Sequence, residues 1–327
     1  MDINQSTDKE YLEKHFSLLI PPTLALIDDE TTSFKTRGYT LLTQLLKPIR
    51  DSHSDILQRT NLSSVFEDAI KPCFYSLPTI TSEDDSIRLL DVAYPALLVV
   101  LKTAHHPADK ASPETQDRYK NAIARILRDH LIPSFHHITS SASFPYPHLS
   151  TLFLTQITTI LPDLAIHTTK YLQELIPILY STLSSPFGPA HVPLLRSAVA
   201  ATRAVILNAH PRIWRWRGEI LGAVCACWVY VLEEEGQLMS RRRGEKSVQE
   251  NEKALSLGVL KKELRGVVYL LRVALENQDS VEDAGQLGAK ESIGEEVREL
   301  VDADDELGEL LLGHVDTEDG SYFGFEF

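Results

Sequence analysis

The sequence predicts an all-α protein whose helices pack as antiparallel pairs, and two observations carry this prediction. Apolar residues recur at three- and four-residue spacing over long windows, as in the run from Ile87 to Leu101. Glycine is scarce in most of the chain, because 8 of the 15 glycines lie in residues 1–275 and 7 in the last 52. Few positions therefore suit tight strand turns or phosphate-cradling loops, which disfavours nucleotide-binding folds.

Helix starts and breaks divide the chain into elements. Ser82 followed by Asp85, and Ser112-Pro113-Glu114, place an acceptor, a proline or an acid where the free N–H groups of a first turn favour them. Stretches rich in Ser, Pro, Gly or charge predict breaks at 104–112, 139–148, 184–193 and 236–247. The predicted helices lie at about 8–20, 22–28, 33–47, 54–60, 62–77, 83–103, 113–131, 149–160, 164–182, 193–208, 211–235 and 248–276.

Proline recurs within this helical pattern. Pro21, Pro133, Pro162 and Pro177 each follow an aliphatic pair and precede another helix, where a proline kinks or restarts the helix. The spacing from Pro95 to Pro133 to Pro177, 38 and then 44 residues, lies near the period of about 40–47 residues of HEAT repeats. The sequence therefore predicts a HEAT-like α-solenoid of antiparallel helix pairs.

The first repeat carries the most complete turn. Asp28 and Asp29 precede an apolar-basic pair that ends in Lys35, followed by Arg37 and Gly38. We expect the Asp29 carboxylate to accept hydrogen bonds from the next helix and Lys35 to pair with an aspartate of the neighbouring repeat. Asp28, Asp29, Lys35 and Arg37 are therefore predicted as structural turn residues, and Gly38 as the point where two helices approach.

The net charge of −14 is concentrated at one end of the chain. Residues 1–275 carry 29 acidic and 30 basic side chains, whereas 276–327 carry 17 and 2. A near-neutral body has no basic surface for sequence-independent nucleic-acid binding. We expect a helical-repeat domain over 1–275, divisible into parts 1–138 and 149–275, and an acidic, flexible tail over 276–327. Aliphatic residues in the tail leave an alternative open, in which it folds on a basic groove.

The cysteine count, the N-terminal sequence and the longest apolar run indicate the cellular compartment. Three cysteines argue against a disulfide framework, and no apolar leader is evident at the N-terminus. The longest apolar run, Ile220–Leu232, has about 13 residues, short of the roughly 20 that cross a bilayer. We expect a soluble protein of the cytoplasm or nucleus, with no membrane partner.

The usual signatures of catalysis are missing. No GxGxxG, GxxxxGK[ST], HExxH, GxSxG or CxxC motif occurs. Cys225 and Cys227 are two residues apart, so their side chains leave a helix on different sides, and the histidine pairs at 105–106 and 136–137 are adjacent. We therefore predict no catalytic residues, no cofactor and no metal site.

The segment that follows Pro211 is the strongest candidate for function. All three tryptophans lie in it or in the helix it opens, interleaved with arginines, a combination enriched in interface hot spots. Arg212, Trp214, Trp216 and Arg217 are therefore candidate partner-binding residues, whereas Trp228 is expected in the core. The alternative is that the whole segment packs into the core, because its helix is apolar over most of its circumference.

A short basic loop separates the last two predicted helices of the domain. It contains Arg241-Arg242-Arg243 and Lys246. The loop could be a solvated turn, an anchor for the acidic tail or for an acidic partner, or a weak nuclear-import signal.

Several of these segments together resemble a known family, the second of the Tel-Two-Interacting proteins, which are subunits of the Triple T (TTT) complex. The resemblance rests on Leu18–Gly38, Val65–Ile70, Leu89–Leu98 with Pro95, and Pro211–Ile213 with Cys227-Trp228. It implies a HEAT-like scaffold without catalysis. The implied partners are the first Tel-Two-Interacting protein, bound directly, and Tel-Two in the same complex.

The resemblance also implies a role as an adaptor to the heat-shock protein 90 machinery. The implied clients are phosphatidylinositol kinase-related protein kinases of the mTOR and ATM type. A different HEAT or armadillo adaptor, in nuclear transport or vesicle coats, is the alternative function, and pull-down from cell extract would separate the two.

Overall fold

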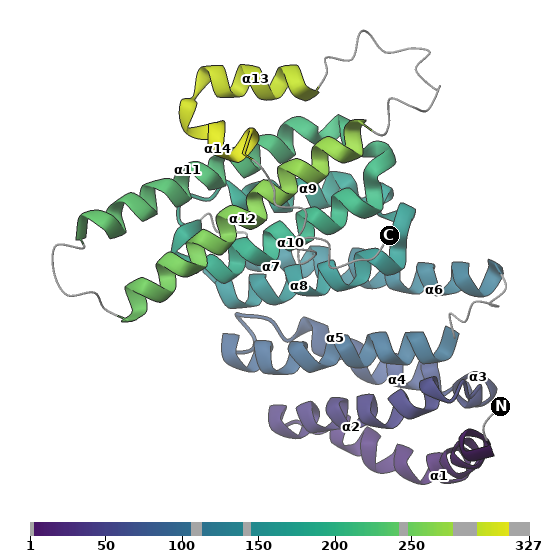
Figure 1. The fold of residues 1–327 in the computed structure, drawn as a ribbon. Helices are drawn as coiled ribbons and strands as arrows, with labels where there is room; N and C mark the ends of the chain where they lie inside the picture. Colours follow the sequence, from purple (N-terminus) through teal and green to yellow (C-terminus); the bar gives the residue numbers. More distant parts are fainter. Residues whose placement is uncertain (1–2, 106–112, 140–144, 242–247, 277–292, 314–327) are drawn as a thin grey trace. The chain divides into compact units, whose positions relative to one another are not determined.

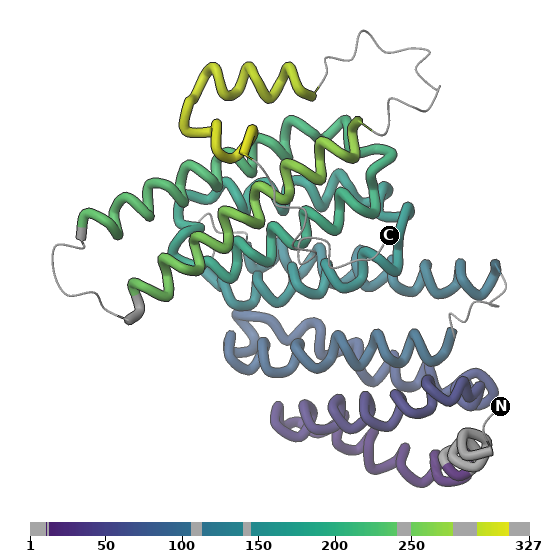
Figure 2. The backbone as a smooth tube through the Cα atoms, in the orientation of Figure 1, coloured from purple at the N-terminus to yellow at the C-terminus, as the bar shows by residue number. Residues whose placement is uncertain are grey.

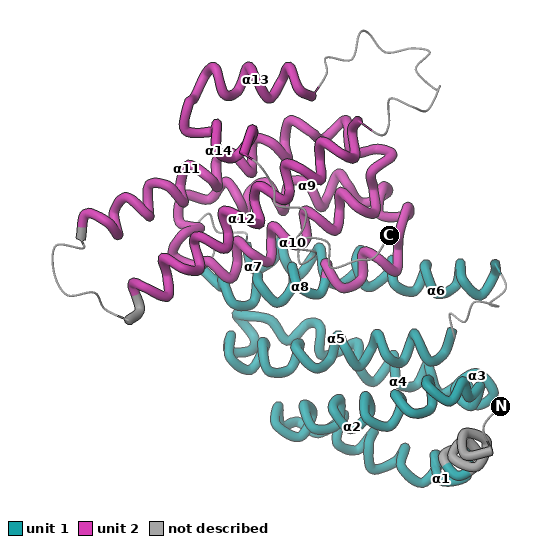
Figure 3. The backbone as a smooth tube through the Cα atoms, in the orientation of Figure 1, with its two compact units in different colours: residues 1–156 teal, residues 157–327 magenta. Residues whose placement is uncertain are grey.

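The computed structural model describes residues 3–105, 113–139, 145–241, 248–276 and 293–313 (Figure 1). Within these ranges every regular element is a helix, so the fold is all-α, as the periodicity predicted. The chain divides into two compact units, residues 1–156 and 157–327, coloured teal and magenta in Figure 3.

Unit 1 is built around α5. The α2 helix packs between α1 and α5, and α5 also contacts α4 and α6. The elements of this unit are α1 (Ile3–Ile27), α2 (Thr32–Asp51), α3 (Ile56–Thr60), α4 (Leu62–Ile70), η1 (Lys71–Tyr75), α5 (Glu83–His105), α6 (Pro113–Ile126), η2 (Leu127–Leu131), α7 (Ile132–Ile138) and the start of α8 (Pro147–Leu164).

The start of α5 shows how the sequence sets a helix boundary. Ser82 Oγ accepts a hydrogen bond from the Asp85 N–H at 3.2 Å and donates one to the Asp85 carboxylate at 2.9 Å. Further along α5, the buried Tyr94 ring stacks on Phe74 with centroids 4.5 Å apart and meets Phe153 edge-on at 6.3 Å. The first turn of α5 is therefore capped and acidic, and the middle of the helix packs in an aromatic core.

Unit 2 is also built from helices that pack on one another. Helix α12 packs on α10 and α11, and α9 packs on α10 and α11. After α8 come η3 (Ala165–Tyr171), α9 (Leu172–Leu183), η4 (Gly188–His191), α10 (Val192–Ala209), η5 (His210–Trp216), α11 (Arg217–Arg241), α12 (Val248–Glu276), α13 (Ile293–Ala303), η6 (Asp305–Leu307) and α14 (Gly308–Leu311).

Proline interrupts the helices less than the sequence predicts. Helix α1 continues through Pro21 and Pro22, both on its exposed side, where two separate helices were expected. The helix predicted at 113–131 continues to Ile138, and a π-helical turn at Leu127–Leu131 precedes Pro133. A π-turn shifts the hydrogen-bond ladder, which accommodates the missing N–H of the proline.

The largest difference from the sequence-based expectation lies in the acidic segment. Acidity predicts a flexible tail from residue 276, but residues 293–311 form α13, η6 and α14, which lie along α11 and α12 (Figure 2). Their buried side chains are Ile293, Val297, Leu307, Leu310 and Leu311. The basic loop at 242–247, and residues 277–292 and 314–327, lie outside the described residues.

Two stretches of the described chain, Pro147–Leu183 and Gly188–Ser240, contain windows long and apolar enough to cross a membrane. In each window 56% of the residues are buried inside the structure. Core helices pass the same test, so these windows are weak evidence for a membrane segment.

Candidate functional site

The candidate partner-binding residues gather at the junction of η5 and α11 in unit 2. Ile213 has no exposed surface and anchors η5 in the core. Trp214 and Trp216, which follow it in η5, are half-buried, and Arg212, which precedes it, is exposed. The segment therefore lies at the border between core and surface, with neither indole fully enclosed.

Arg217, the fourth candidate, is engaged within the chain. Its Nε lies 2.8 and 3.0 Å from the two carboxylate oxygens of Glu296 on α13, and its Nη1 donates to the Trp214 carbonyl at 2.9 Å. The Arg217 and Glu296 side chains are 33% and 19% exposed. Arg217 thus fixes the backbone of Trp214 and binds α13, a pairing across 79 residues that no local pattern could reveal.

A shallow hollow lies beside the first turns of α11. Ile176 and Tyr180 of α9 line it together with Glu219 and Ile220 of α11. Tyr180 is 44% exposed, and its ring lies 3.7 Å from where a Cβ on Gly222 would stand. A Cβ at this position would make only ordinary contact with the ring, and the hollow combines apolar side chains with the carboxylate of Glu219.

Trp228 occupies the core position that the sequence predicts. It has no exposed surface, and its indole N–H donates to the Glu306 carbonyl at 3.1 Å. The Lys261 ammonium lies 4.9 Å from the ring centroid, within range of a cation–π interaction.

The predicted repeat turn joins α1 to α2 in unit 1. Asp29 Oδ1 accepts a hydrogen bond from the Thr31 N–H at 2.7 Å, one residue before the helix instead of within its first turn. Asp28 and Arg37 are exposed. A Cβ on Gly38 would lie 2.8 Å from the Ile27 backbone nitrogen, so the predicted close approach of two helices occurs here.

Unit 1 contains a buried thiol, that of Cys73. Burial raises the pKa of Cys73 to about 12, and the hydrogen bond with Tyr39 and the positive charge of Lys35 lower that pKa only in part. The Tyr39 hydroxyl, hydrogen-bonded to the same thiol, has a pKa raised by burial. A thiol held protonated is a poor nucleophile, so Cys73 behaves as a packing residue.

The other cysteines have the same character. Burial raises the pKa of Cys227 to about 12 and that of Cys225 to about 11, with the Asp304 carboxylate adding to the shift at Cys225. In the described part of the chain no three His, Cys, Asp or Glu side chains form a group that could hold a metal ion.

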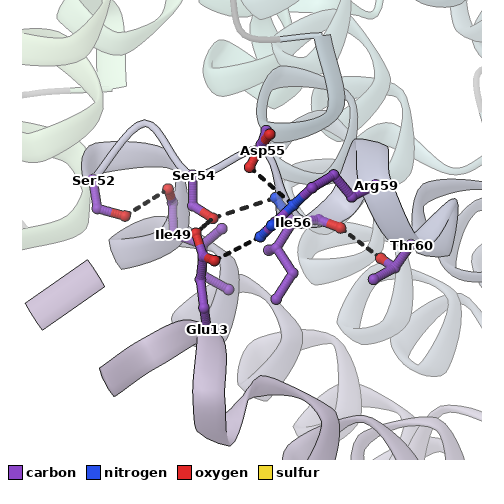
Figure 4. Close-up of polar contacts among 8 residues, drawn as sticks. All are labelled: Glu13, Ile49, Ser52, Ser54, Asp55, Ile56, Arg59 and Thr60. Carbon is purple, nitrogen blue, oxygen red and sulfur yellow. Dashed lines mark hydrogen bonds and ion pairs between the residues drawn. The ribbon is translucent and has the colours of Figure 1, made fainter. Parts of the chain in front are cut away.

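A polar cluster that the sequence did not suggest ties α1 to the segment 52–60 (Figure 4). Ser54, which is 1% exposed, donates to Glu13 Oε1 at 2.5 Å, and Arg59 Nη2 donates to Glu13 Oε2 at 2.6 Å. Arg59 Nε also lies 3.1 Å from the Asp55 carboxylate. Because both carboxylate oxygens of Glu13 are bound, the cluster has a structural role and offers no free acid or base.

Comparison with known proteins gives one match. The model of the Tti2 family matches residues 3–190, which includes all of unit 1 except its first two residues and the start of unit 2. No curated protein and no solved structure matches the chain.

Proposed function

The chain belongs to the Tti2 family, because the family model covers more than half of its residues, and from this premise we propose that it is a non-catalytic scaffold subunit of the TTT complex. The family match is the observation that carries the proposal. Membership supports the context of that complex in general, and the finer roles below are proposed from it.

The direct partner in this proposal is the first Tel-Two-Interacting protein, with Tel-Two in the same complex. Through them the chain would connect the heat-shock protein 90 machinery to the maturation and stability of phosphatidylinositol kinase-related kinases. We place this activity in the cytoplasm and the nucleus. We propose that no nucleic acid or membrane takes part and that the helix pairs within each unit are HEAT-like repeats.

The contact surface in this proposal includes Arg212, Trp214 and Trp216. The position of these residues supports the proposal. Two half-buried indoles and an exposed guanidinium lie in η5, and the buried Ile213 anchors this segment in the core. Half-buried aromatics with a firm support lose little conformational entropy when a partner covers them. The apolar hollow at Tyr180 extends the same side of α11.

The absence of catalysis is proposed on two grounds. The family is that of a complex subunit, and the thiols Cys73, Cys225 and Cys227 all have pKa values raised by burial, which opposes nucleophilic chemistry.

Co-purification of the tagged full chain from cell extract, followed by mass spectrometry, tests the proposal. We expect the first Tel-Two-Interacting protein and Tel-Two in near-equal amounts, with large kinases and chaperone subunits at lower abundance. Recovery of nuclear-transport cargo or coat proteins in their place would contradict it and favour the other adaptor class.

A further inference from the structure

Residues 293–311, here called the C-terminal strap, lie in a groove on α11 and α12. Three leucines at positions i, i+3 and i+4, Leu307, Leu310 and Leu311, face the groove and are 6%, 1% and 2% exposed. Helix α14 packs on α12, and η6 packs on α11. The strap is therefore seated by one apolar edge that η6 and α14 form together.

One core side chain, that of Trp228, forms a hydrogen bond to the main chain of the strap. The Trp228 indole N–H is the only polar group of a fully buried ring, and it donates to the Glu306 carbonyl at 3.1 Å. A buried donor is costly to leave without an acceptor. Because any peptide carries carbonyl groups, this donor recognises a backbone and is indifferent to the side chain.

Cations border the apolar part of the groove. Arg265 Nη1 and Lys261 Nζ lie 3.4 and 3.9 Å from the two carboxylate oxygens of Glu309, and Arg217 binds Glu296 further along. Lys261 also pairs with Glu235 at 3.2 Å and lies over the Trp228 ring. Glu309, the acid two residues after Leu307, thus lies near two positive charges.

We propose that this groove is a docking site for a short acidic amphipathic helix of a partner protein, and that the C-terminal strap occupies it in cis. The ligand chemistry is the one that the strap displays at 306–311: an acid, a leucine, a small residue, a second acid and two leucines. The inference goes beyond the proposed function, because it does not depend on which complex the chain joins.

The cis occupant is of a kind that can be displaced. The Glu309 side chain is 55% exposed, so its ion pairs are screened by solvent and salt. Sixteen residues separate the strap from α12 in the sequence, so the strap competes for the groove as a covalently attached segment. A partner helix with the same pattern and a larger contact therefore competes with the strap.

The test uses the full chain and a fluorescent synthetic peptide of residues 293–313. In the variant Glu296→Arg with Glu309→Arg, reversed charges on the strap face Arg217, Lys261 and Arg265 and expel it. We expect fluorescence anisotropy to show 1:1 binding of the peptide at least about tenfold tighter than to the wild-type chain, whose groove is filled. The matched control, Glu299→Arg with Asp302→Arg, makes the same charge change on exposed positions of α13 and should bind like the wild type.

Specificity for the groove is tested by charge exchange. Arg265→Glu in the expelled-strap variant should weaken the peptide about tenfold, and a peptide carrying Glu309→Lys should restore the affinity. If the expelled-strap variant does not fold, the single change Glu309→Arg is measured in the same way. A folded variant that binds the peptide no better than the wild type overturns the proposal. So does light scattering that shows a wild-type dimer lost in the variant, because the trans ligand would then be the strap of a second copy.

Discussion

The indole N–H of Trp228 donates to the carbonyl oxygen of Glu306 across 78 residues of chain, and it does so from a side chain with no exposed surface. This hydrogen bond joins the core of unit 2 to a segment whose composition predicts flexibility. Its loss would leave a buried donor without an acceptor, at a cost of about 1–3 kcal/mol.

Removal of the C-terminal strap should lower stability. A chain ending at residue 292 loses five buried apolar side chains and the acceptor of Trp228, so we expect Tm to fall by about 5 °C or more relative to a chain ending at 313. Differential scanning calorimetry measures both. The composition of the acidic segment predicts the opposite, an unchanged melt, and that result would show that the strap adds nothing to the fold.

Two glycines offer a matched pair of substitutions. Gly38→Ala should destabilise the protein by about 1–3 kcal/mol, because the new Cβ meets the Ile27 backbone at 2.8 Å. Gly258→Ala, on α12 with open space around it, should be neutral or stabilise by up to about 1 kcal/mol. Urea unfolding gives both free-energy changes. Equal effects of the two substitutions would contradict a close α1–α2 contact at Gly38.

Alkaline pH should destabilise the fold through its thiols. Cys73 and Cys227 have pKa values of about 12, against 9.0 for an ordinary thiol. A raised pKa in the folded state favours the protonated form, so this stabilisation is complete below pH 9.0 and is lost as the pH rises toward about 12. The urea midpoint should fall over this range, less steeply in Cys73→Ala and Cys227→Ala, with Tyr39 and Tyr94 keeping part of the slope. A slope unaltered in both variants would contradict the assignment.

The three tryptophans should separate into two classes. Trp214→Ala and Trp216→Ala remove half-buried rings and should leave a folded protein that loses about 2 kcal/mol or more of partner binding. Trp228→Ala removes a fully buried ring and should cost about 3–5 kcal/mol of folding stability. Thermal melts and partner pull-down on the same variants measure both. Unfolding of both Trp214→Ala and Trp216→Ala, or normal binding by both, would move the partner surface elsewhere.

Local signals predicted most of the helices. Ser82 with Asp85 marks the start of α5 because the capping bonds form within four residues, and the apolar spacing of 248–276 matches α12 at both ends. The predicted helix breaks at Pro21 and Pro133 were wrong. Pro21 lies on the exposed side of α1, and a π-helical turn precedes Pro133, and in both places the helix continues through the proline.

Long-range pairings could not be predicted from the sequence in the same way. The candidate residues Trp214 and Arg217 were found from composition, but the Glu296 that holds Arg217 lies 79 residues away in a segment whose charge argued against order. The leucines at 307, 310 and 311 carry helical spacing, and their burial depends on a groove formed by α11 and α12, which no local window contains.

The most direct test of the scaffold function is size-exclusion chromatography with light scattering of the purified full chain mixed with the purified first Tel-Two-Interacting protein. The proposed function predicts a stable 1:1 complex, diminished by Trp214→Ala and Trp216→Ala and retained by the exposed control Glu299→Arg. Separate elution of the two wild-type proteins at micromolar concentration would contradict it.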